Sequence, residues 1–178
     1  IGIKVNAMND ADIMAQLVRA SAAGTEVELF VRGICCLRPG VPGRTEHISV
    51  RSIIGRYLEH ERIFVFGRGE AQEVFIGSGD LLERNTMRRI EAFTAVTDPG
   101  ARAEVLEVLS AMRRDNRQAW IMQPDGTMKL EVRRGDKGQL HVRGLNASPA
   151  GDRRAVEGVT ALELILVEVR DWNGLLRF

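Results

Sequence analysis

The first half of the chain alternates and clusters apolar residues in the way that buried strands and amphipathic helices require. Residues 1–5 and 26–31 each predict a strand. Residues 13–20 place their apolar side chains on one helical face, and Asp10 or Asp12 can cap that helix. A strand, a helix and a strand in close succession predict a βαβ unit, in which two parallel strands lie side by side with the helix on one face.

More strands and one long helix follow. Strands are expected at residues 48–54, 63–66, 73–76 and 88–96, with a short helix or turn at 80–84. Asp98-Pro99 is typical of a helix start, and Arg113 and Arg114 suit the last turn of that helix because cations complement the helix dipole. These elements together predict one α/β domain.

The chain changes character after Asn116. Asp125-Gly126, between two apolar runs, predicts a hairpin over residues 120–130. A second hairpin is expected within residues 130–142 and a polar loop at 146–158, whereas residues 159–169 fit both a strand and a short helix. We therefore expect a main domain over residues 1–128 and a β-rich extension of uncertain fold over residues 129–178.

Composition is that of a soluble globular protein. Hydrophobic residues make up 44% and charged residues 28% of the chain, and no apolar run approaches the ~20 residues that span a bilayer. The only cysteines, Cys35 and Cys36, are adjacent in sequence, which excludes a disulfide framework and makes a poor zinc site. We interpret them as buried, unpaired residues of a reducing compartment.

The basic residues are almost all arginine. Of 25 lysines and arginines only three are lysine, although the net charge is +1. A guanidinium binds two phosphate oxygens at once, so arginine suits phosphate recognition. A GC-rich genome also favours arginine, however, so only the positions of the arginines can support phosphate binding.

Two regions of the sequence place polar and charged side chains at the ends of predicted strands. Arg32 directly follows a predicted strand, where ligands bind in open α/β sheets. His60 and Arg62 precede the strand at 63–66, and Ser78 and Asp80 follow its hairpin partner. Pairing of that hairpin brings these four side chains to one edge of the sheet, which is an arrangement suited to phosphoryl chemistry.

Several motifs in this order resemble the bacterial polyphosphate kinases of the first type. They are Val31-Arg32-Gly33-Ile34-Cys35-Cys36-Leu37, Arg56-Tyr57-Leu58-Glu59-His60, Gly77-Ser78-Gly79-Asp80, Arg84-Asn85 and Arg89-Ile90-Glu91. The resemblance covers roughly residues 1–128 and falls on the last catalytic domain of a much longer enzyme. It implies a phospholipase-D-like fold, with a mixed sheet flanked by helices, in which His60-x-Arg62 replaces that superfamily's histidine-x-lysine pair.

The resemblance also implies a reaction. The terminal phosphate of ATP passes reversibly to an enzyme histidine and then to polyphosphate, with Mg²⁺ assisting. The phosphorylated histidine lies in a preceding domain, so we expect this chain to be inactive alone and to work with those preceding domains. We also expect a cytoplasmic homo-oligomer without nucleic-acid partners; membrane association through the full-length oligomer is left open.

Roles for individual residues follow from the same resemblance and from their chemistry. His60 and Arg62 are assigned to catalysis, since imidazole can donate a proton or attack phosphorus and a guanidinium stabilises charge. Asp80, besides orienting the imidazole, can carry metal. The phosphate-binding set is Arg32, Arg89, Ser78 and Asn85, and the metal-binding set is Asp80 and Glu91.

Two other functions remain open at this point. The chain could be half of a phospholipase-D-like phosphodiesterase or nuclease that is completed by dimerisation, although Arg62 in place of lysine speaks against it. It could also be a polyanion-binding module without catalysis, in which case replacing His60 would leave polyphosphate affinity unchanged.

Overall fold

The computed structural model describes residues 1–131 and 164–165, and within these residues all strands belong to one mixed sheet. The strand order is β8-β7-β3-β2-β1-β4-β5-β6-β9. The strands are β1 Gly2–Val5, β2 Val27–Val31, β3 Ile48–Ile53, β4 Ile63–Phe66, β5 Glu73–Gly77, β6 Phe93–Ala95, β7 Ala119–Met122, β8 Met128–Leu130 and β9 Leu164–Ile165.

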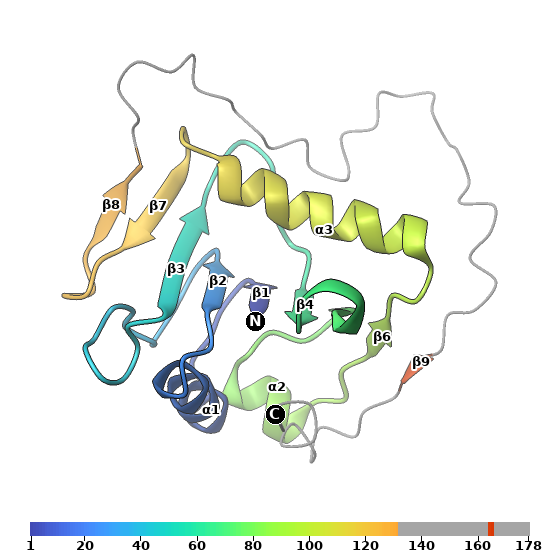
Figure 1. The fold of residues 1–178 in the computed structure, drawn as a ribbon, viewed down its shortest axis with the longest axis horizontal. Coiled ribbons are helices and arrows are strands. Elements are labelled where there is room, and N and C mark those ends of the chain that lie inside the picture. The colour runs from blue at the N-terminus through green and yellow to red at the C-terminus, as the bar shows by residue number, and fades with distance from the viewer. Residues whose placement is uncertain (132–163, 166–178) are drawn as a thin grey trace.

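Helices cover both faces of this sheet (Figure 1). Helix α3 (Pro99–Arg114) lies across one face, and α1 (Ala11–Ala22) and α2 (Glu83–Arg88) lie on the other. A 3-10 turn, η1 (Gly69–Ala71), joins β4 to β5. The predicted α/β class, a phospholipase-D-like mixed sheet flanked by helices, is confirmed.

The alternation of strand residues produces two hydrophobic cores. Ile3, Val5 and Leu29 pack with α1 residues such as Leu17. Phe30, next to Leu29 in the sequence, belongs to a second core. There it packs with Ile63 and Val65 of β4 and with Leu109 and Met112 of α3. Each central strand is therefore buried on both faces, as expected of a sheet between two helical layers.

The predicted local signals are confirmed for most elements. Strands β1 and β2 are parallel, so the βαβ unit forms, and Asp10 is the residue that caps α1 by accepting from the backbone N–H of Ile13 at 3.0 Å. Asp98 caps α3 in the same way, through Ala101. Strands β4 and β5 form the predicted antiparallel hairpin, and β7 and β8 form the hairpin around Asp125-Gly126.

The segment after Asp80 differs from the prediction. Residues 88–96 were expected to form a strand, but Arg88 ends α2 and the strand is confined to β6. The helix forms because it buries Thr86, whose hydroxyl donates to Asp10, while Arg88, Arg89 and Ile90 remain exposed and gain little from a strand. The short helix or turn expected at residues 80–84 is found a few residues later, as α2.

The two cysteines also differ from the prediction. Cys36 is exposed and Cys35 is only partly buried, because both lie on an irregular segment beyond the end of β2. Tyr57 and Leu58, on the irregular segment between β3 and β4, are also exposed. The hairpin within residues 130–142, the loop at 146–158 and most of 159–169 lie outside the described residues, so the boundary at 128 stays a prediction. Within the described part, no helix is long and apolar enough to cross a membrane.

Candidate active site

A pocket of 620 Å³ opens at the edge of the sheet where β1, β2 and β5 end. These three strands run in the same direction, so their carboxyl ends meet at one edge. Seven of the eight predicted site residues line it, namely Arg32, His60, Arg62, Ser78, Asp80, Asn85 and Arg89. The predicted convergence of the histidine and the three arginines is therefore present, although the role of each residue stays a prediction.

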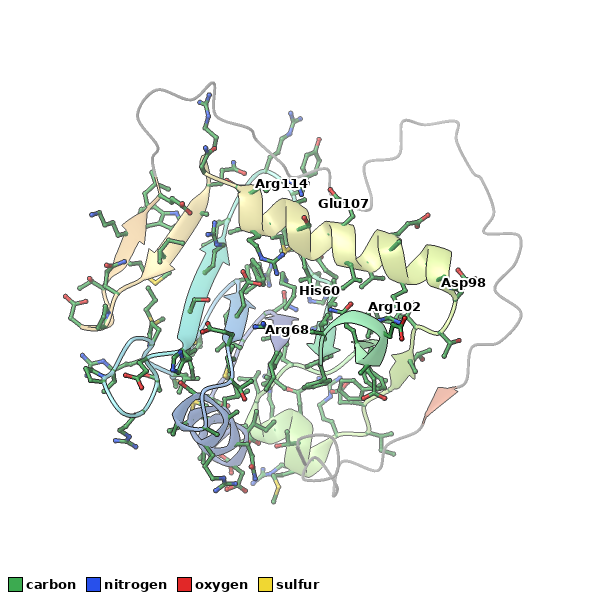
Figure 2. All side chains as sticks on the ribbon, in the orientation of Figure 1. His60, Arg68, Asp98, Arg102, Glu107 and Arg114 are labelled. Carbon is green, nitrogen blue, oxygen red and sulfur yellow. The ribbon has the colours of Figure 1, made fainter. Side chains whose placement is uncertain are left out.

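His60 lies on the irregular segment between β3 and β4 (Figure 2) and its side chain is exposed. Its Nδ1 is 3.0 Å from Nη1 of Arg62, and the same Nη1 donates to the His60 carbonyl at 3.0 Å. Its Nε2 is 3.4 Å from Nη2 of the same guanidinium, so Arg62 faces both ring nitrogens. A guanidinium can only donate, and we assign Nδ1 as the acceptor because its contact is the shorter one, which leaves the ring proton on Nε2. Arg62 thus fixes both the backbone and the ring of His60.

Asp80 holds that arginine in place. Its Oδ2 accepts from Nη2 of Arg62 at 3.1 Å and its Oδ1 from Nε at 3.3 Å, so the pair is bidentate. The backbone N–H of Asn6 donates to the same Oδ1 at 2.7 Å and the Asn6 amide at 3.2 Å. Burial alone would raise the pKa of Asp80, but hydrogen bonds from Arg62 and Asn6 outweigh burial and lower the pKa below 3.8. Asp80 thus contacts the guanidinium of Arg62, and its contact with the imidazole, expected from the sequence, is not made.

Glu91 organises a second group behind the pocket. Its carboxylate is buried and accepts from the Ser78 hydroxyl and, at 2.6 Å, from the Asn85 amide. Arg89 Nε lies 3.4 Å from the same carboxylate. Three of the four residues assigned to phosphate binding are therefore held by one glutamate that does not itself line the pocket.

These contacts bear on where Mg²⁺ could bind. Asp80 and Glu91 were assigned as metal ligands, yet each carboxylate already binds an arginine and uses both oxygens. The described residues contain no group of three histidine, cysteine or acidic side chains placed to share an ion. The donor set does not fit a resident metal site, and the assignment of these two residues stays untested.

Arg32 and Arg84 are the uncommitted cations of the pocket. Both line it, and neither guanidinium has a hydrogen-bond or ion-pair partner among the described residues. A structural arginine would be paired with a neighbouring acidic residue, as Arg62 and Arg89 are. Two unpaired guanidiniums facing one pocket are instead available to an anionic ligand.

Three contributors were not assigned from the sequence. Asn6 and Arg84 line the pocket. Lys4 donates hydrogen bonds to the backbone carbonyls on both sides of His60. Asn6 could have been found, because it directly follows β1 at the edge where Arg32 follows β2. Lys4 carries no such signal, since a lone lysine inside a strand is ordinarily a surface residue.

Glu59 and Glu61 lie around Lys4. Oε1 of each is buried and has no other hydrogen-bond partner among the described residues, so a proton shared by the two carboxyls would satisfy both oxygens. Burial, with a smaller contribution from Glu61, raises the pKa of Glu59 to about 7, and the Lys4 ammonium opposes this shift. Glu59 therefore titrates near neutral pH, directly beside His60 in the sequence.

A larger recess, of 710 Å³, lies on the α3 side of the sheet. Its walls carry Glu26, Glu28 and Glu107, and its Arg113 is bound by Glu28. Figure 2 shows Glu107 along α3 with Arg114, with which it forms an ion pair. Because its acidic groups offset its cations, this recess is less suited to phosphate than the smaller pocket around His60.

The chain has clear relatives. A family described as polyphosphate kinase C-terminal domain 2 matches residues 1–142. A protein named polyphosphate kinase from Thermosynechococcus vestitus is 48% identical over 148 residues, and one from Streptomyces coelicolor is 50% identical over 126 residues. These alignments cover 80% and 71% of this chain but only 20% and 17% of the two relatives.

A solved structure is also similar. The crystal structure of polyphosphate kinase from Porphyromonas gingivalis matches with a TM-score of 0.73 and 39% identity, over 77% of this chain and 21% of that one. The chain thus spans about a fifth of the length of the proteins it matches.

The ion pair between Asp80 and Arg62 generates the first prediction. We expect Asp80→Asn to lower the free energy of unfolding at pH 7 by about 1–3 kcal/mol, because a partly buried guanidinium loses its charged partner. The folded-state pKa of Asp80 is lowered, so its contribution is present above its ordinary pKa and disappears as the pH falls through the lowered value. Urea denaturation at pH 7 and about pH 3 measures both effects. Glu104→Gln, an exposed change on α3, is the control; equal stability of Asp80→Asn and wild type at pH 7 would contradict the assignment.

The raised pKa of Glu59 generates the second prediction. Its stabilisation is lost as the pH rises, whereas that of Asp80 is lost as the pH falls. The folded state holds this proton between pH 4.5 and about 7, so its stabilisation is complete below pH 4.5 and is lost as the pH rises through about 7. Glu59→Gln, which mimics the protonated form, should remove this loss and leave the variant more stable than wild type at about pH 8, on the order of 1–2 kcal/mol. Urea denaturation across this range is the measurement. A wild-type slope that persists in Glu59→Gln would show that another group titrates.

Proposed function

Because this chain belongs to the polyphosphate kinase family, as its C-terminal domain 2, we propose that it supplies one side of an active site that transfers phosphoryl groups reversibly between ATP and inorganic polyphosphate. The histidine that carries the phosphoryl group lies, in this proposal, in a preceding domain of the full-length enzyme. This chain contributes the phosphate-binding arginines and an auxiliary histidine.

One observation carries the proposal: Arg32, Arg62, Arg84 and Arg89 line a single pocket together with His60. A transferring phosphoryl group spreads negative charge over three oxygens and requires little covalent chemistry from the protein. Catalysis then consists of positioning the group and stabilising its charge with donors that are already in place. Two of the four guanidiniums are fixed by carboxylates, and two are free to bind oxygens.

The proposed reaction has two displacements. In the first, a ring nitrogen of the histidine in the preceding domain attacks the terminal phosphorus of ATP; the P–N bond forms, the P–O bond breaks, and ADP leaves with the electron pair. In the second, a terminal oxygen of polyphosphate attacks the same phosphorus and the P–N bond breaks. The arginines of this chain would hold the phosphate oxygens in line through both steps, and Nε2–H of His60 would donate a hydrogen bond to the leaving oxygen.

Mg²⁺ would enter bound to the nucleotide and neutralise part of the phosphate charge. The carboxylates of this pocket do not need to hold it, since they already fix Arg62 and Arg89.

The rim of the pocket supports the idea of a half-site. Ile34, which lines the pocket, is 65% exposed, and Ile90, which directly follows the pocket residue Arg89 in the sequence, is 82% exposed. Large exposed apolar side chains at a binding pocket are typical of a surface that another part of a protein covers. A half-site also agrees with a chain that spans about a fifth of its relatives' length.

The third prediction concerns Arg32. We expect Arg32→Ala to weaken the binding of polyphosphate to this chain by roughly 1.5–3 kcal/mol, because an unpaired guanidinium in the pocket loses its charge-assisted contacts. Calorimetric titration at low salt provides the affinity. Arg44→Ala is a matched control, since Arg44 is exposed on the loop before β3, at the opposite end of the sheet. An equal effect of both changes would indicate non-specific attraction to the basic surface.

The fourth prediction separates catalysis from binding. The isolated chain should form no polyphosphate from [γ-³²P]ATP, whereas the chain within its full-length enzyme should form it. In the full-length enzyme, His60→Ala should reduce the rate by about 10²–10⁴-fold if the imidazole acts as a proton donor. Robust synthesis by the isolated chain would refute the half-site.

The same assay addresses the alternatives. Cleavage of a phosphodiester substrate by the chain, without synthesis of polyphosphate, would favour the phospholipase-D-like hydrolase. Unchanged polyphosphate affinity and unchanged synthesis after His60→Ala would favour a binding module without catalysis.

A further inference from the structure

Lys4 is a buried lysine that the proposed reaction does not use. Its side chain is 3% exposed, in the middle of β1. Its ammonium group donates to the backbone carbonyls of Glu59 at 3.0 Å and of Glu61 at 3.3 Å, the two residues that flank His60. The carboxylate of Glu61 is 3.9 Å away.

The segment that carries His60 depends on such contacts. It is irregular from Ile54 to Arg62, and no strand partner binds the carbonyls of residues 59–61. Side chains bind them instead: Lys4 takes the carbonyls of residues 59 and 61, and Asn6 and Arg62 take the carbonyl of His60, at 3.4 and 3.0 Å. Lys4 and Asn6 are two residues apart on one strand and its extension, so their side chains project to the same side.

We propose that Lys4 is a positioning residue for His60: by clamping the carbonyls on both sides of the histidine to the central strand β1, it sets the place and the orientation of the imidazole in the pocket. It touches neither the ring nor the pocket, so it acts only through the backbone of residues 59–61. The consequence for polyphosphate affinity rests on the function proposed above; the consequence for the ring does not.

A purely structural role accounts poorly for this lysine. Its strand partners Phe30 and Ile63 belong to the apolar core against α3, and an apolar residue there would avoid the cost of burying an ammonium. Burial lowers the pKa of Lys4, and Glu61 and Glu59 oppose that shift, so the surroundings contain the groups that keep a cation tolerable. Two of the three donors of the ammonium bind the two carbonyls, and the carboxylate of Glu61 lies 3.9 Å away as an ion-pair partner.

The test is the imidazole spectrum of the ¹⁵N-labelled 178-residue chain, with His60 assigned by its loss in His60→Gln. We expect separate Nδ1 and Nε2 shifts of one tautomer in the wild type. In Lys4→Met, which keeps the length but removes the donors, the two shifts should move toward an averaged value. Affinity for polyphosphate should fall on the order of tenfold, because a displaced His60 is no longer held in the geometry that binds the ligand.

Val65→Ala is the matched control, since Val65 lies in the same α3-facing core and its truncation destabilises without touching residues 59–61. It should keep the wild-type His60 spectrum. If Lys4→Met does not fold, Lys4→Gln, which retains an N–H donor, is compared with Val65→Ala by the same spectrum. A folded Lys4 variant with the wild-type His60 spectrum overturns the proposal, and so does an equal change in Val65→Ala. A wild-type chain that does not bind polyphosphate would refute the proposed function while leaving the spectral test intact.

Discussion

The candidate active site depends on the carboxylate of Asp80. It lies just beyond β5, binds the guanidinium of Arg62 before β4, and accepts the backbone N–H of Asn6 beyond β1. One side chain therefore ties together the ends of three strands, and through Arg62 it reaches the ring and the carbonyl of His60. A charged pair that is largely shielded from water costs desolvation, and the added hydrogen bonds from Asn6 offset that cost.

The pocket separates its cations into two kinds. Arg62 and Arg89 are fixed by carboxylates, so little conformational entropy remains to be lost when a ligand binds. Arg32 and Arg84 have no partner within residues 1–131 and keep their donors for the ligand. Fixed cations give the pocket its geometry, and free cations give it capacity for an anion. Pairing of every arginine would leave no donor for a ligand, and pairing of none would leave the pocket without fixed donors.

A second pair of carboxylates acts on the pocket only indirectly, through Lys4. Glu59 and Glu61 do not contact the pocket, but they surround the ammonium of Lys4, which binds the backbone on both sides of His60. Glu91 plays a comparable part for Ser78, Asn85 and Arg89. Acidic residues of this region thus serve mainly to hold donors in place. Two of them, Asp80 and Glu91, which the sequence suggests as metal ligands, bind protein donors through both oxygens in the structure.

Sequence patterns by themselves determined the alternation of strands and helices, the caps at Asp10 and Asp98, and the grouping of His60, Arg62, Ser78 and Asp80, because these depend on local spacing and on one short hairpin. They could not determine which partner each charged group takes. Asp80 pairs with Arg62 and Asn6, Glu59 and Glu61 with Lys4, and Arg88 joins a helix rather than a strand; these outcomes are set by contacts between residues up to 74 positions apart. Hydrophobic periodicity is a property of neighbours in sequence, whereas the pairing of buried charges is decided only when the sheet brings its strand ends together.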